Sequence, residues 1–169
     1  MGELRLVART TLVLVAALAL QLGLVDDLSL FSVHPELLLA VGVGSAVAWG
    51  AERGAVVGFF AGLLADLFLS GRFGVTGLAY ALAGYAVGVL SEGIARRSRV
   101  VDAGLVALGS ALGVALYALV AALFGEGTLG DDHLWRILGI VTVTAALMSP
   151  IVVPVCRWAG ADAELRPSR

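Results

Sequence analysis

Residues 54–66 hold the side chains whose types and spacing point most directly to a function. Gly54, Gly58, Gly62 and Asp66 recur every four residues within an otherwise apolar segment. Positions four apart lie on one face of a helix. In a membrane, a glycine face lets another helix pack closely. An acid within a membrane segment is costly to bury, so Asp66 is a candidate functional residue.

The depth of Asp66 narrows its possible roles. Counting helix rise from Gly54 places it about 18 Å along the helix, level with Tyr80 of the following helix. Tyr80 or Arg72 is therefore the expected partner of the carboxylate. Three roles stay open: a brace for the turn between the two helices, a contact that couples to a partner, and proton or substrate handling. The brace is favoured because the chain has few other polar groups at this depth.

The remaining reactive side chains do not form a catalytic pattern. His34 and His133 fall in separate connecting segments, and no nucleophile–base motif or phosphate loop is present in the sequence. The single cysteine, Cys156, cannot form an internal disulfide and reads as an apolar packing residue. We therefore expect no enzymatic activity, no metal site and no cofactor.

Composition identifies the class of protein. Hydrophobic residues make up 60% of the 169 residues and charged residues only 14%, whereas soluble domains have about 45–50% apolar and about 25% charged residues. The chain is predicted to be one all-α integral membrane domain over residues 1–169, with the lipid bilayer around it and no affinity for nucleic acid.

Six transmembrane helices fit the uncharged runs. The second and third runs are read as a hairpin, because Glu52 and Arg53 would be costly at the centre of one merged helix. Pro35 and Glu36 mark the outer start of the second helix. The predicted helices cover residues 7–27, 35–51, 54–70, 73–92, 102–125 and 134–158.

The arginines predict the orientation. With six spans, nine of the eleven basic residues lie on the side of the termini, and only Arg72 and Arg136 lie on the other. Such a bias marks the cytoplasmic side, so both termini are expected to be cytoplasmic. The cytoplasmic basic loop formed by Arg96, Arg97 and Arg99 fits either anionic lipid binding or topology determination alone.

Glycines also recur on the predicted helix that follows residues 54–70. Gly77, Gly84 and Gly88 lie on the fourth predicted helix. Such faces serve either packing within the bundle or docking of a partner helix, and both alternatives stay open for all six glycines.

The order of these elements resembles the rod shape-determining protein MreD family. The resemblance is carried by Pro35-Glu36 followed by three leucines, the ladder from Gly54 to Asp66, and the series of Gly74, Gly77, Tyr80, Gly84 and Gly88. Size and six-helix layout extend it over nearly the whole chain. The family is also distantly similar to the substrate-binding S-component bundles of energy-coupling-factor transporters.

The resemblance implies a non-enzymatic membrane scaffold for peptidoglycan synthesis during cell elongation. Its implied partner is an MreC-like bitopic protein, and the wider machinery includes an MreB-like filament, a RodA-type glycosyltransferase and a class B penicillin-binding protein. The implied location is the bacterial cytoplasmic membrane, as a multi-pass protein. The alternative is the substrate-binding subunit of a vitamin-type transporter. The sequence favours the scaffold, because the first helix lacks the Ala-x-x-x-Ala pair that those subunits use for docking.

Overall fold

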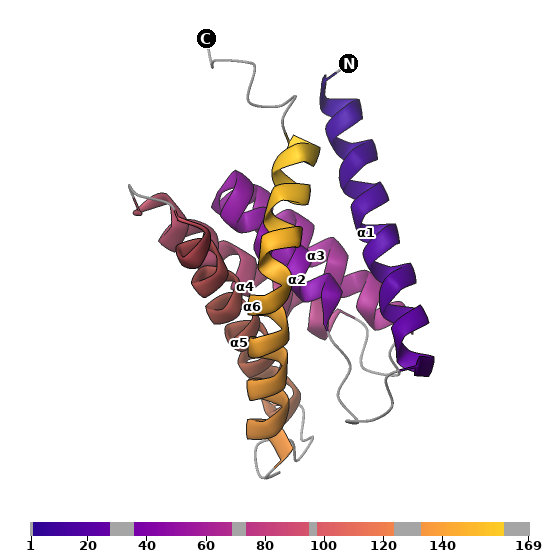
Figure 1. The fold of residues 1–169 in the computed structure, drawn as a ribbon. Helices are drawn as coiled ribbons and strands as arrows, with labels where there is room; N and C mark the ends of the chain where they lie inside the picture. Colours follow the sequence, from indigo (N-terminus) through magenta and orange to yellow (C-terminus); the bar gives the residue numbers. More distant parts are fainter. Residues whose placement is uncertain (1, 28–35, 69–73, 95–97, 124–132, 161–169) are drawn as a thin grey trace.

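The computed structural model describes residues 2–27, 36–68, 74–94, 98–123 and 133–160. These residues form helices and contain no strand, in agreement with the all-α class expected from the sequence. The helices are α1 (Gly2–Asp27), α2 (Leu37–Trp49), α3 (Ala51–Phe68), α4 (Val75–Glu92), α5 (Arg99–Leu123) and α6 (His133–Gly160). The beginning of α1 and the end of α6 lie at the same end of the bundle (Figure 1).

Helix α2 is the centre of the bundle. It contacts each of the other five helices, and 11 of its 13 residues, Leu37 to Val47, are buried. A helix that is apolar on every side belongs in the interior. Its length of about 20 Å is less than the roughly 30 Å of a bilayer core. Because protein encloses it, α2 does not have to match the membrane thickness alone.

A sharp turn at Gly50 joins α2 to α3. Gly50 has φ +87°, a conformation that costs glycine little and other residues more. The Ala51 amide donates to the Glu92 carboxylate at 3.0 Å, which ties the start of α3 to the end of α4. The sequence placed this turn at residues 51–53. The structure begins α3 at Ala51, because the break in helical geometry falls on the glycine.

Glycines set the spacing among α2, α3 and α4. A Cβ added to Gly58 would lie 2.6 Å from the Tyr80 carbonyl oxygen, and one added to Gly62 would lie 2.5 Å from the Gly77 Cα. Gly84 likewise faces the backbone of α3, while Gly54 and Gly88 face Ala46 and Ala51. All six glycines of the predicted faces therefore pack against helices of this chain.

At the contacts of α2 with α5 and α6, side chains of one helix pack against glycines of the other. Val43 and Leu39 of α2 fit against Gly109 and Gly113 of α5, where an added Cβ would come within 2.5 and 2.7 Å of them. On α6, Val152 packs against Gly44 in the same way. The core is thus organised around α2 by small residues on both partners.

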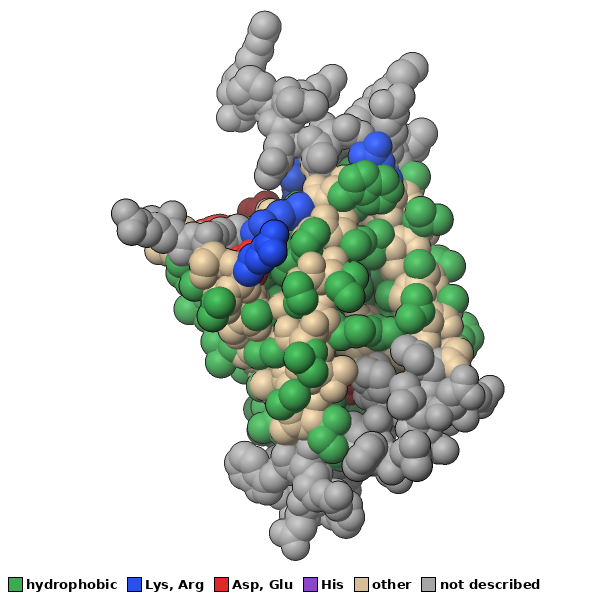
Figure 2. Space-filling view, viewed as in Figure 1, with side chains coloured by type: hydrophobic (Ala, Val, Ile, Leu, Met, Phe, Trp, Pro, Cys, Tyr) green, Lys and Arg blue, Asp and Glu red, His purple; other side chains and the backbone are tan. Residues whose placement is uncertain are grey.

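Four of the helices in the described ranges are long and apolar enough to cross a membrane. The qualifying segments of the described chain are Leu6–Gly23, Val75–Glu92, Arg99–Leu123 and Ile137–Gly160. Helix α2 is too short by itself, and α3 carries Glu52, Arg53 and Asp66 within 18 residues. Hydrophobic side chains cover the body of the face seen in Figure 2, and arginines gather towards the end that carries the termini.

The backbone contact between Gly62 and Gly77 gives a stability test. We predict that Gly62→Ala destabilises the bundle by about 1–3 kcal/mol through overpacking against Gly77. This is the net cost, after the roughly 1 kcal/mol that alanine gains over glycine within a helix. The control is Gly104→Ala on α5, where an added Cβ meets nothing within 4 Å. Thermal unfolding in detergent should show a lower midpoint for the Gly62 variant alone. Equal midpoints for the two variants would contradict this packing.

Candidate functional site

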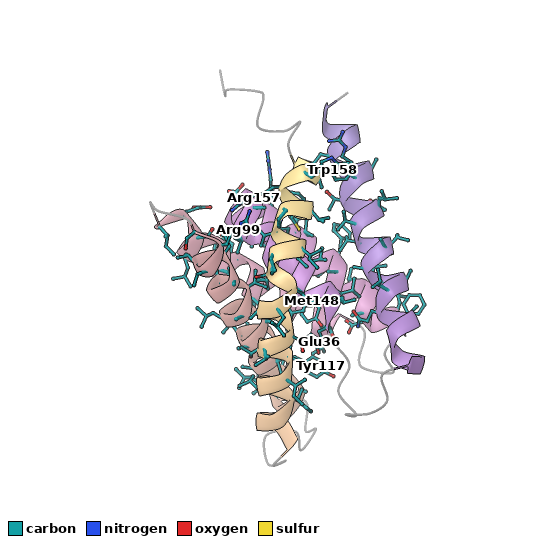
Figure 3. All side chains as sticks on the ribbon, in the orientation of Figure 1. Glu36, Arg99, Tyr117, Met148, Arg157 and Trp158 are labelled. Carbon is teal, nitrogen blue, oxygen red and sulfur yellow. The ribbon has the colours of Figure 1, made fainter. Side chains whose placement is uncertain are left out.

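A hydrogen bond joins α2 to α4 at the end of the bundle opposite the termini. The Tyr80 hydroxyl donates to Glu36 Oε2 at 2.9 Å. Tyr80 is buried within α4, and Glu36 directly precedes α2. Figure 3 places Glu36 and Tyr117 towards this same end. The bond fixes the start of the central helix against its neighbour.

Asp66 closes the turn between α3 and α4. Its Oδ2 accepts a hydrogen bond from the Gly74 amide at 2.7 Å, and the side chain is buried. Gly74 caps α4 with φ +96°. The first amides of a helix lack partners within it and attract negative charge. Asp66 therefore supplies an acceptor where α4 begins.

The hydrogen bond of Tyr80 differs from the one expected from the sequence. The sequence analysis offered Tyr80 or Arg72 as the partner of Asp66. The Tyr80 hydroxyl instead binds Glu36, because α2 brings its own carboxylate to that side of α4. Arg72 lies outside the described residues, as does Pro35 at the outer start of the second helix.

Helix register explains why the two carboxylates lie at one level. Glu36 is 14 residues before Gly50 and Asp66 is 16 residues after it, which corresponds to about 21 and 24 Å of helix rise. Sequence reasoning singled out Glu36 without finding its bond to Tyr80. Counting in both directions from the hairpin turn would have found it. We call Glu36, Asp66 and Tyr80 the polar layer.

Charged side chains also join helices at the end of the bundle that carries the termini. Arg157 of α6 forms an ion pair with the buried carboxylate of Asp102 on α5, at 2.7 Å. The guanidinium of Arg9 on α1 lies 5.0 Å from the ring centre of Trp158 on α6. Figure 3 shows Arg157 and Trp158 near the end of α6. Sequence reasoning missed both contacts, which join residues far apart in the chain.

The basic loop that was predicted to be cytoplasmic is described only in part. Arg99 is the first residue of α5 and is exposed. Arg96 and Arg97 lie outside the described residues, so the predicted cluster of three arginines stays a prediction.

The chemistry of the polar layer is that of a brace. Each carboxylate accepts a hydrogen bond from a neighbouring element. Buried acceptors satisfied in this way stabilise one arrangement, because any other arrangement would leave them without a donor. Within the described ranges, no group of three or more histidine, cysteine or acidic residues could hold a metal ion.

The Glu36–Tyr80 bond can be tested with a pair of tyrosine variants. We predict that Tyr80→Phe lowers the free energy of unfolding by about 1–3 kcal/mol, because Glu36 loses its donor. Tyr85→Phe is the control, since Tyr85 lies on the same helix but is exposed, and its effect should stay within about 0.5 kcal/mol. Unfolding monitored in detergent checks both. A Tyr80 variant as stable as the Tyr85 variant would refute the bracing role.

Comparison with known proteins identifies the family. No curated protein and no solved structure matches the chain. The family model of the rod shape-determining protein MreD matches residues 3–157. This range contains the whole polar layer, the turn at Gly50 and the glycine contacts of α2, α3 and α4. Because the match covers nearly the whole chain, this integral membrane protein belongs to the MreD family of rod shape-determining proteins.

Proposed function

We propose that the chain is a non-enzymatic scaffold that binds the transmembrane helix of an MreC-like bitopic protein. The observation that carries this proposal is the family match over residues 3–157, which gives the chain a role in rod-shape determination. The polar layer supports a structural role, because its carboxylates are engaged in bracing helices.

We further propose six membrane spans with both termini in the cytoplasm, in the cytoplasmic membrane of a bacterium. Helix α2 counts as a span because five helices surround it. Helix α3 counts because its charges fall near its ends, with Asp66 satisfied by Gly74. The gathering of arginines towards the end of the termini supports the orientation (Figure 2).

The outward face of α4 is the proposed docking surface. It presents an exposed stripe, which we call the α4 stripe, formed by Leu78, Leu82, Tyr85 and Val89. Their separations of four, three and four residues follow the 3.5-residue repeat of paired helices. The opposite face of α4 packs through Gly84 and Gly88 against α2 and α3. The helix that carries the α4 stripe is therefore held tightly against the rest of the bundle.

This placement revises where a partner should be sought. The sequence analysis left the glycine faces available for a partner helix. In the structure their surfaces are covered by neighbouring helices of the chain. Substituting Gly58 or Gly62 would disturb the fold itself, so such variants do not test binding. Binding is better tested from exposed side chains.

The wider assembly and the transporter alternative have less support. An MreB-like filament, a RodA-type glycosyltransferase and a class B penicillin-binding protein are proposed only through the family. For a vitamin transporter, we would expect a polar cavity open at the outer end. The polar layer, which lies at that end within the described residues, is engaged in hydrogen bonds within the protein, so we favour the scaffold.

Crosslinking in intact cells tests the docking surface. A photoreactive amino acid at Leu82 should crosslink to a bitopic membrane protein, because this position is at the centre of the α4 stripe. The control position is Leu108 on α5, which is 54% exposed against 46% for Leu82. Products are identified by mass spectrometry. Equal yields of the bitopic protein from the two positions, or none from Leu82, would rule out the α4 stripe as the docking surface.

A further inference from the structure

A hollow of about 670 Å³ lies between α1 and α3, away from the α4 stripe. Its apolar wall includes Leu6, Leu14 and Val15 of α1, with Val56 and Phe60 of α3. Thr10 also lines it, but its hydroxyl is bonded to the Leu6 carbonyl at 2.8 Å. We call this feature the α1–α3 hollow.

The position of α1 explains the hollow. Helix α1 packs mainly on α2 and α6 and only sparsely on α3. Arg9 attaches it to Trp158 of α6, and Gln21 accepts a hydrogen bond from the Leu38 amide of α2 at 3.2 Å. Both attachments lie away from α3, so the space between α1 and α3 is left for another molecule.

The length of the hollow corresponds to one leaflet. Its lining runs from Leu6 to Val15 on α1 and from Glu52 to Leu64 on α3, which is about 14 and 18 Å of helix rise. Half of a bilayer core is about 15 Å. The hollow begins at the end of the termini and stops near mid-membrane, whereas a crossing helix would need contact over the full thickness.

The lining of the hollow also suits a hydrocarbon tail. Most of the residues around it are apolar, and they extend over only one leaflet. A flexible acyl chain matches both this length and this lining.

The mouth of the hollow carries one charge of each sign. Glu52 and Arg53 line it, and both are exposed. Among the described residues, neither makes an ion pair or a side-chain hydrogen bond. A carboxylate beside a guanidinium complements a headgroup that carries both an ammonium and a phosphate.

We propose that the α1–α3 hollow binds one phospholipid of the leaflet on the side of the termini. An acyl chain occupies the apolar part, the phosphate contacts Arg53 and a primary ammonium contacts Glu52. The lipid fills the space that the sparse packing of α1 on α3 leaves open. The occupant is thus a phosphatidylethanolamine-type lipid.

Native mass spectrometry of the detergent-purified protein tests this site, with added phosphatidylethanolamine or phosphatidylglycerol carrying identical acyl chains. The wild-type protein should retain one phosphatidylethanolamine molecule. Val56→Trp fills the hollow and should lower retention at least tenfold. Its control, Leu108→Trp, changes a residue of similar exposure outside the hollow, 54% exposed against 55% for Val56, and should behave as wild type.

Headgroup recognition is tested by charge variants. Arg53→Gln should weaken retention of both lipids several-fold, while Arg99→Gln, at an exposed arginine at the start of α5, should not. Glu52→Gln should abolish the preference for phosphatidylethanolamine over phosphatidylglycerol. Wild-type retention by the Val56 variant, or an unchanged preference in the Glu52 variant, would overturn the proposal.

A photoreactive residue at Val15 separates a lipid from a protein occupant. Val15 lines the inner part of the hollow. In intact cells it should yield lipid adducts that disappear with Val56→Trp. A protein adduct in their place would mean that a partner helix occupies this site, and the proposal would be rejected. This result does not depend on crosslinking from the α4 stripe.

Discussion

Backbone-to-backbone contact among α2, α3 and α4 is the constraint on which the rest of the structure depends. Gly62 meets Gly77, and Gly58 meets the backbone at Tyr80, without side chains between them. In lipid, helices gain from such contacts because dispersion and close approach replace the hydrophobic drive that water supplies to soluble proteins. This close approach also brings Tyr80 within hydrogen-bonding distance of Glu36. A wider separation would leave both polar groups without their partners.

The sequence predicted those features that depend on local spacing. Six helices, the membrane class and a place for Asp66 near the turn between α3 and α4 could be predicted from uncharged runs and four-residue repeats. The central position of α2 was harder to predict, because a short apolar helix reads the same whether protein or lipid surrounds it. The contacts Arg157–Asp102 and Arg9–Trp158 join distant parts of the chain. No spacing rule within one segment could have revealed them.

Glycines and polar residues fix different aspects of the helix packing in this bundle. The glycines determine how closely the helices approach. A face of glycines has no side chains that would stop one helix from sliding along the other. Glu36, Asp66 and Glu92 each bind one specific donor on another element, so they define the vertical register at both ends. A single register matters for the proposed scaffold. The side chains of the α4 stripe keep a constant arrangement for a partner only if α4 cannot slide along its neighbours.

The central position of α2 has a consequence for biogenesis. Helix α2 leaves the ribosome second, yet its neighbours α5 and α6 follow much later in the chain. Until α6 arrives, Gly44 lacks the Val152 side chain that packs on it, and the Val41 carbonyl lacks the Cys156 thiol, 3.8 Å away. Until α5 and α6 have been made, the short helix α2 is therefore covered only in part. Completion of the bundle coincides with insertion of the last helix, so C-terminal truncation exposes the centre of the protein rather than its edge.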